Sequence, residues 1–280
     1  MYCKSIPSEN FENTIFGVEQ WGNTGLKSMD YAFYEITSLQ SIPSDNTNAF
    51  ENVESFDYSF TSLNLTSIPE GLFGCCNSVT EFNYTFKSCE YLSEIPAGLF
   101  SNCTNTESFK ATFANCTALT SIPSDIFANC TNVSEFTSTF FGCYSLSEIP
   151  EELFKNCTNI TDFGFLFNHC TSLTTIPETL FSYCEKAASF QATFQECYGI
   201  TSIPTALFDN NKSVTSFSYT FNGLSAAEGE SPYTVIDGEK VHLYERNDYP
   251  DIFATVTSYE DCFYNCYQIS DLDDIPDAWK

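Results

Sequence analysis

The sequence predicts an α/β repeat protein, folded as a right-handed solenoid whose coils of about 27 residues stack on one another. One observation is an Ile-Pro pair that returns at intervals of 27 residues at every step from Ile68 to Ile203. Another is that the 28 Phe and 14 Cys of the chain recur mostly in fixed columns of the unit. Repeats of this kind cannot bury their apolar faces alone, so neighbouring coils are expected to stack.

Every coil is expected to hold the same short elements. Residues 133–136 and 146–149 predict two short strands, and the Pro at 150 ends the second because proline has no N–H for a ladder. Phe136, Phe140 and Cys143 follow the spacing i, i+4, i+7, which predicts one or two helical turns between the strands. The coil is therefore expected to run strand, short helix, strand, turn.

Apolar columns supply the expected core. The two longest phenylalanine columns hold Phe56, Phe82, Phe109, Phe136, Phe163, Phe190 and Phe217, and Phe33, Phe60, Phe86, Phe113, Phe140, Phe167, Phe194, Phe221 and Phe263. A further column holds Phe73, Phe100, Phe127, Phe154, Phe181 and Phe208. In a stacked fold these rings are expected to lie one above another.

The pattern Val-x-x-Phe-x-x-x-Phe-x-x-Cys-x-x-Leu-x-x-Ile-Pro resembles the BspA-like leucine-rich-repeat family, from Leu26 to Pro276 apart from one insertion. The resemblance implies a leucine-rich-repeat solenoid. It also implies a non-enzymatic binding or adhesion module, located outside the cell or on a bacterial cell surface, that recognises a protein or glycan. The alternative is a structural spacer that presents another part of a longer surface protein.

The whole chain is expected to form one solenoid, because the repeat runs through it with a single interruption. Its parts are a truncated first coil with an insertion at residues 1–25, regular repeats at 26–222, an inserted hairpin at 223–255, and a modified C-terminal coil and cap at 256–280. Asp237-Gly238 between apolar runs predicts the hairpin turn. Because the repeat begins in mid-coil, further residues are expected upstream, including any export signal. The hairpin is interpreted as a cap over the last coil, with a ligand-binding loop as the alternative.

The charge excludes several classes of partner. The chain has 37 acidic against 10 basic residues and a formal net charge of −27. Nucleic acids and anionic lipids both require clusters of Lys and Arg, so neither is expected to bind. No apolar run is long enough to insert into a membrane. The expected ligand is basic, neutral or bridged by calcium, and the protein is expected to be a monomer.

Motifs for catalysis and cofactors are absent from the sequence. It contains no Gly-x-Ser-x-Gly, no His-Glu-x-x-His, no phosphate-binding Gly-rich loop and no EF-hand pattern. Asp271, Asp273 and Asp274 lack the EF-hand spacing and are interpreted as a solvated turn, with a calcium site as the alternative. We therefore expect neither enzymatic activity nor a cofactor.

Eleven of the 14 cysteines lie in two columns: Cys76, Cys103, Cys130, Cys157 and Cys184, and Cys89, Cys116, Cys143, Cys170, Cys197 and Cys266. Other coils mostly place Phe, Leu or Ile in these columns, so the thiols are expected to behave as small buried hydrophobic groups. Disulfides are the alternative, because stacked Cα atoms about 5 Å apart can be bridged. Cys75 with Cys76, and Cys262 with Cys266, are the pairs where local bonding is worth testing. Zinc requires paired Cys or Cys/His ligands, which the sequence lacks.

Candidate ligand contacts fall on two surfaces. Between the Leu and Ile columns, polar residues are expected to form rows along the stack, among them Thr120, Ser121, Glu148, Thr174 and Thr175. These rows suit either a solvated strand face or a docking surface. The inserted hairpin adds Tyr233, His242, Tyr244 and Arg246, because aromatic and Arg side chains dominate binding hot spots.

Overall fold

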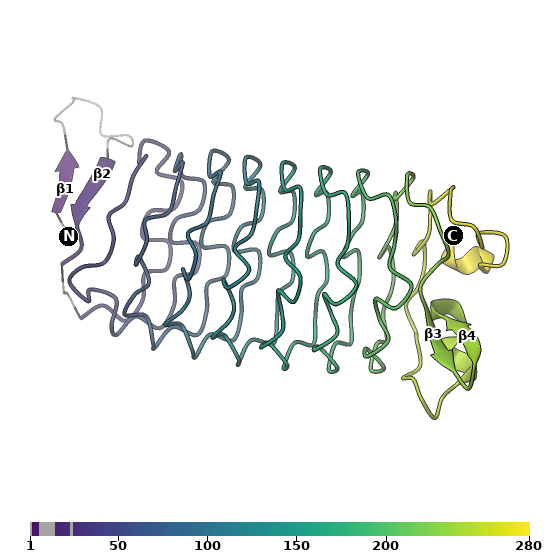
Figure 1. Ribbon diagram of the computed structural model, residues 1–280. Coiled ribbons are helices and arrows are strands. Elements are labelled where there is room, and N and C mark those ends of the chain that lie inside the picture. The colour runs from purple at the N-terminus through teal and green to yellow at the C-terminus, as the bar shows by residue number, and fades with distance from the viewer. Residues whose placement is uncertain (1, 6–14, 23–24) are drawn as a thin grey trace.

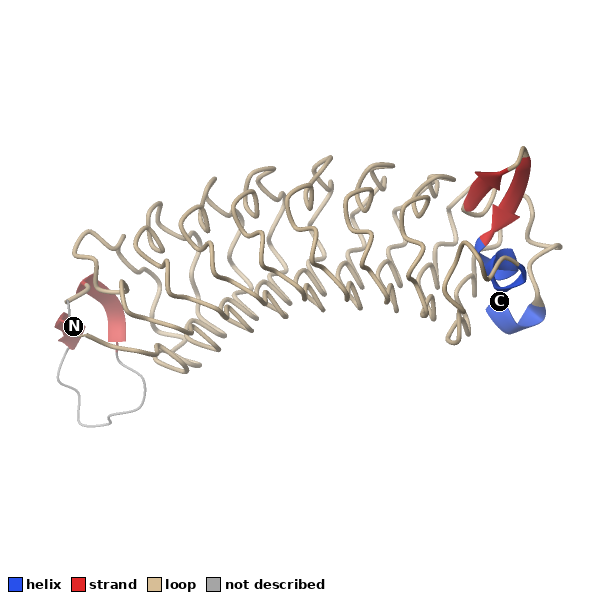
Figure 2. Ribbon diagram, turned by 90° about the horizontal axis from the view of Figure 1, so that it is seen from below, coloured by secondary structure: helices blue, strands red, loops and turns tan. Residues whose placement is uncertain are grey.

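The structure is a computed structural model that describes residues 2–5, 15–22 and 25–280. Its coils lie side by side in one elongated, arched molecule with the termini at opposite ends (Figures 1 and 2). Among the described residues, regular elements occur only near these ends. They are strands β1 (Tyr2–Ser5), β2 (Ile15–Gln20), β3 (Tyr233–Ile236) and β4 (Glu239–His242), and the 3₁₀ helices η1 (Leu243–Asp248) and η2 (Asp277–Trp279).

The described part of residues 1–25 forms an antiparallel pair, in which β1 lies against β2 with Cys3 opposite Val18. The other residues of the expected first coil lie outside the described ranges. Trp21 follows β2 and is buried, and its ring lies against those of Phe33 and Phe50 at centroid distances of 5.9 and 5.0 Å. This segment therefore covers the aromatic core at the N-terminal end of the stack.

The prediction of strands and helical turns within the coils is wrong. Where strand pairing was predicted, the described coils have isolated single-residue parallel bridges, such as Ser108 with Glu135 and Glu135 with Asp162. The segment with the i, i+4, i+7 spacing is a run of turns. Its Ser138 and Gly142 have φ angles of 59° and 68°, which lie in the left-handed region and interrupt a right-handed helix.

In these turns, alternate backbone amides donate hydrogen bonds to the next coil. The amides of Phe136, Ser138, Phe140 and Gly142 donate to carbonyl oxygens 26 residues further on, at 3.2, 2.8, 3.0 and 2.8 Å. The intervening amides donate to carbonyls three residues back, as Thr139 does to Phe136 at 3.1 Å. The amides of Phe136 and of residues 138–143 are thus satisfied without a helix.

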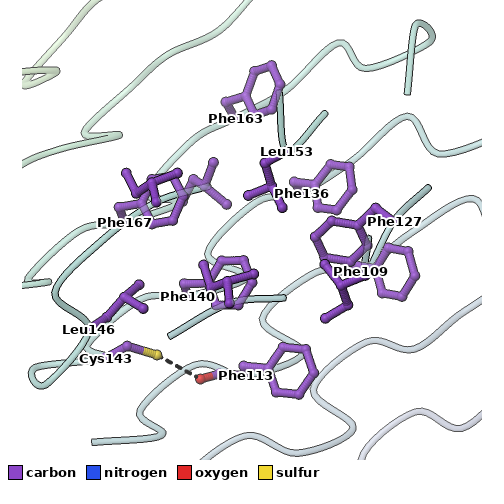
Figure 3. Close-up of a cluster of buried hydrophobic side chains, with 14 of the residues drawn as sticks. Phe109, Phe113, Phe127, Phe136, Phe140, Cys143, Leu146, Leu153, Phe163 and Phe167 are labelled. Carbon is purple, nitrogen blue, oxygen red and sulfur yellow. Dashed lines mark hydrogen bonds between the residues drawn. The ribbon is translucent and has the colours of Figure 1, made fainter. Parts of the chain in front are cut away.

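The predicted phenylalanine columns are confirmed. Phe109, Phe136 and Phe163 are all fully buried and their rings are nearly parallel, with centroid distances of 5.6 and 6.5 Å between successive rings (Figure 3). Phe127 and Phe154 fill the space beside Phe136, with centroids 4.6 and 4.8 Å from its own. The fold is therefore a stack of coils around a continuous aromatic core.

The predicted burial of the column cysteines is also confirmed. The thirteen cysteines for which side chains are described are free thiols; Cys75 is half-buried and the others are buried. The Cys143 thiol donates to the carbonyl oxygen of Phe113 at 3.3 Å (Figure 3), and the same contact recurs along its column. Burial raises the pKa of Cys143 to about 12, so the thiol stays protonated and can keep this hydrogen bond.

Candidate ligand-binding surface

A hollow on the face predicted to dock ligands crosses three coils. We call it the acidic groove, about 710 Å³ in volume, with a polar lining of Ser124, Glu148, Glu151, Thr175 and Glu178. Its apolar floor is formed by Ile122, Ile149, Pro150, Ile176 and Pro177. Two residues expected as ligand contacts, Glu148 and Thr175, therefore meet here.

The Ile-Pro motif shapes this groove. Ile149 is 6% exposed and anchors the coil in the core, whereas Glu148 and Glu151 on either side are exposed. Pro150 is half-buried and has no N–H, so it forms no rung to the neighbouring coil. Where the sequence has an acidic residue at both positions, the repeat therefore places one carboxylate before and one after the buried Ile-Pro pair.

The carboxylates of the acidic groove lack cationic partners. Within the described ranges, no Lys, Arg or His lies within ion-pair distance of Glu148, Glu151 or Glu178. Lys155 lines an adjoining hollow of about 270 Å³, but its Nζ pairs with Glu152 Oε2 at 2.8 Å. A concave surface with one sign of charge raises the local concentration of ligands of opposite charge.

The other expected contacts on this face play different parts. Thr120 is exposed, and its hydroxyl donates to the carbonyl oxygen of Ser93 at 3.3 Å, which helps to hold two coils together. Ser121 and Thr174 are exposed and lie outside the groove lining. Glu151 and Glu178 were missed at the level of sequence, although both directly follow an Ile-Pro pair and could have been found from that motif.

The hairpin candidates are packed against the last regular coil, in the segment interpreted as a cap. Strands β3 and β4 pair antiparallel, with Asp237 and Gly238 at the turn. Arg246 is 1% exposed, and its guanidinium donates to the carbonyl oxygens of Asn211 at 3.0 Å and Phe208 at 2.9 Å. Arg246 therefore pairs with two backbone carbonyl groups of the last regular coil, and almost none of its side chain is accessible to a ligand.

His242 is 8% exposed and belongs to a buried polar cluster in the same cap. Its Nδ1 lies 2.8 Å from the hydroxyl of Ser231, which donates to Asp271 Oδ2 at 2.6 Å. His242 Nδ1 also lies 3.5 Å from Asp271 Oδ2, and the serine hydroxyl donates to the aspartate, whereas in an acyl-transfer triad it donates to the histidine. The cluster therefore joins the hairpin to the C-terminal coil. No sequence pattern predicts this cluster, because Ser231 and Asp271 are 40 residues apart.

Two aromatic residues complete the cap. The Tyr244 ring is stacked on His242 at a centroid distance of 5.2 Å and meets Trp279 edge-on at 6.4 Å. Tyr233 is half-buried, with Lys240 Nζ 4.5 Å from its ring centroid. Packing of this kind favours the interpretation of residues 223–255 as a cap.

Two further classes of feature are not found among the residues that the structure describes. No group of three His, Cys, Asp or Glu side chains is arranged to hold a metal ion. No helix is long and apolar enough to cross a bilayer.

Comparison with known proteins identifies the repeat. A family described as the BspA type leucine-rich repeat region (6 copies) matches residues 4–133 and 93–225. No curated protein matches the chain. Solved structures that resemble it include a leucine-rich repeat protein from Bacteroides ovatus, at 17% identity and a TM-score of 0.28, covering 89% of this chain and 82% of that one.

Two more solved structures are similar at the same low level. A leucine-rich cell surface protein from Faecalibacterium prausnitzii shares 16% identity, with a TM-score of 0.30 and coverage of 95% of this chain and 86% of that one. A chain of the Toll–Spatzle complex from Drosophila shares 17% identity, with a TM-score of 0.34 and coverage of 77% of this chain. The match spans 36% of that longer chain.

Proposed function

Because the chain belongs to the BspA-type leucine-rich repeat family, we propose that it is a non-enzymatic binding or adhesion module that holds a protein or glycan ligand along its coil face. Such repeats generally mediate binding, and stacked coils offer an extended surface for it. The proposal takes the stack to be a right-handed solenoid displayed outside the cell or on a bacterial cell surface, as the family resemblance implies.

The observation that carries the proposal is the acidic groove. Its three carboxylates lie on the strip that successive coils present side by side, and none has a cationic partner in the described structure. A ligand with basic groups, or a neutral ligand rich in hydrogen-bond donors, complements this surface. The Ile-Pro floor would add apolar contact area beneath the carboxylates.

A binding screen tests the proposal. Immobilised mucins, matrix proteins and glycans are incubated with the protein, and retained protein is measured at low and raised salt. We expect retention on a subset of the panel that weakens as salt rises, because charge attraction over an exposed surface is screened. Retention on no member of the panel would contradict the proposal and favour a spacer that presents another part of a longer surface protein.

A matched pair of variants links retention to the groove. Glu148→Gln with Glu178→Gln removes two groove carboxylates, and Glu90→Gln with Glu185→Gln removes two exposed carboxylates elsewhere. The first pair should lower affinity by about tenfold, while the second changes it less than about twofold. Equal effects of the two pairs would show that net charge alone, and not the groove, determines binding.

A further inference from the structure

A second surface, in the N-terminal coils, carries a ladder of tyrosines. We define the tyrosine ladder as Tyr31, Tyr58 and Tyr84. The rings of Tyr31 and Tyr58 are stacked at a centroid distance of 4.8 Å and an interplanar angle of 7°, and those of Tyr58 and Tyr84 at 4.4 Å and 9°. Tyr34 meets Tyr31 edge-on at 5.6 Å. Tyr31 is 58% exposed and Tyr34 40% exposed, whereas Tyr58 and Tyr84 are half-buried, so the aromatic surface is most accessible at Tyr31 and Tyr34.

The ladder arises from one column of the repeat. Tyr31, Tyr58 and Tyr84 have φ angles of 55°, 56° and 57°, in the same left-handed turn that Ala111 occupies in the next coil with a φ of 51°. The shared backbone holds the rings parallel, so little side-chain entropy remains to be lost when a ligand packs on them. The ladder ends at Ala111, and Lys87 Nζ lies over the Tyr84 ring, 5.4 Å from its centroid.

Carboxylates run beside the ladder, because two of the tyrosines directly follow an aspartate, Asp30 or Asp57. Asp30 Oδ1 accepts the Ser55 hydroxyl at 2.6 Å and the Asp57 amide at 3.0 Å. Asp57 Oδ1 accepts the Asn83 amide at 2.9 Å. Backbone and side-chain hydrogen bonds thus hold both carboxylates in place.

This row of carboxylates is not neutralised within the described structure. No Lys, Arg or His forms an ion pair with Asp30, Asp57 or Glu81 among the described residues. Of the nearby cations, Lys27 pairs with Glu54 at 3.1 Å, Lys110 pairs with Glu135 at 3.4 Å, and Lys87 lies over the Tyr84 ring without an ion pair among the described residues. Burial, together with the Glu81 and Asp30 carboxylates, raises the pKa of Asp57 to about 6, against the pull of hydrogen bonds from Asn83.

We propose that the tyrosine ladder and the adjoining carboxylates of Asp30, Asp57 and Glu81 form a docking surface for an arginine-bearing segment of a partner protein. A guanidinium is planar and weakly hydrated, so it can stack on an end ring of the ladder, where one face is not covered by another ladder ring, while its N–H fork binds a carboxylate. A neutral sugar would stack on the rings but would leave the carboxylates uncompensated. The surface uses none of the residues of the acidic groove, and the inference does not depend on it.

The test uses two fluorescein-labelled peptides, Gly-Arg-Gly-Arg-Gly and Gly-Lys-Gly-Lys-Gly, and measures fluorescence anisotropy with the intact protein. We expect the arginine peptide to bind at least about fivefold more tightly, because lysine cannot both stack and bind in a bidentate manner. Tyr31→Ala with Tyr34→Ala should abolish this preference, and Asp57→Asn should weaken arginine-peptide binding by about tenfold. Alanine is compatible with the backbone at Tyr31, since Ala111 adopts the same conformation.

Two controls make the result specific. Tyr144→Ala with Tyr198→Ala removes tyrosines that are 47% and 49% exposed on other coils and should leave the preference for arginine unchanged. Glu148→Gln with Glu178→Gln should leave that preference unchanged too. Loss of ligand binding at the acidic groove can therefore be distinguished from loss of arginine binding at the tyrosine ladder. Melting curves verify that each variant is folded. Equal binding of the two peptides by the wild type, or equal loss in the Tyr144 and Tyr198 control, would overturn the proposal.

Discussion

The guanidinium of Arg246 donates through Nη2 to the carbonyl oxygen of Phe208 at 2.9 Å, although the two residues are 38 positions apart. Through this bond the segment that interrupts the repeat closes the end of the stack. Arg246 Cζ also lies 4.5 Å from the ring centroid of Phe253, which places the charge against an aromatic face. An arginine that looks like a binding hot spot in the sequence is thus part of the core.

Replacing Arg246 should destabilise the protein without affecting binding at the coil face. Arg246→Ala leaves the carbonyls of Asn211 and Phe208 buried and unpaired, which should lower the free energy of unfolding by about 2–4 kcal/mol. Urea unfolding followed by circular dichroism measures the change. Tyr249→Ala, at a residue 36% exposed, is the control and should have little effect. If Arg246→Ala unfolds at the wild-type urea concentration, the cap interpretation is wrong.

A single truncation tests the aromatic core. Phe136 is fully buried, with the rings of Phe109, Phe127, Phe154 and Phe163 around it. Phe136→Ala should lower the free energy of unfolding by about 3–5 kcal/mol, since a cavity opens between coils that cannot close up. Phe136→Leu, which retains most of the volume, should cost clearly less. Equal and small losses in both variants would show that the column is not tightly packed.

The column thiols should be unreactive in the folded protein. Burial raises the pKa of Cys89, Cys143, Cys157 and Cys266 to about 12, so almost no thiolate forms near neutral pH. In a Cys3→Ser background, a thiol reagent should label at most Cys75 in the folded protein. After denaturant is added, it should label all the remaining cysteines. Rapid native labelling of most thiols, or a mass deficit from several disulfides, contradicts this expectation.

Asp57 should make stability depend on pH in an unusual direction. Its folded pKa of about 6 lies above the ordinary value near 4, so its contribution is fully present below about pH 4 and is lost as pH rises through 6. Asp57→Asn should therefore raise stability relative to wild type at pH 7 more than at pH 4.5. Denaturant midpoints at the two pH values measure this difference. The exposed Asp273→Asn serves as control; a difference of the same size there would contradict the assignment.

Sequence periodicity predicts the features that recur in every coil of the stack. The rings at Phe109, Phe136 and Phe163 and the buried thiols follow directly from columns, because each coil must match its neighbours. The helical turn was mispredicted because the left-handed positions in this column hold residues such as Ser138, Phe165 and Tyr219, none of which signals positive φ. Spacing alone cannot distinguish such turns from a helix.

The candidate sites were only partly predictable for the same reason. Glu148 and Thr175 could be placed on one exposed strip, because they occupy repeat columns. The burial of Arg246 and the Ser231–His242–Asp271 cluster could not be predicted, since they depend on how a non-repeating segment folds back on the last coil. Periodicity carries no information about such contacts.

The most direct test of the central claim, that ligand binds on the coil face and not on the cap, is one set of dissociation constants. The ligand retained most strongly in the screen is titrated against wild type, Glu148→Gln with Glu178→Gln, and Tyr244→Ala with Arg246→Ala, each corrected for the folded fraction. The account predicts about tenfold weaker binding for the groove variant and unchanged affinity per folded molecule for the cap variant. Wild-type affinity in the groove variant together with lost affinity in a folded cap variant would contradict it.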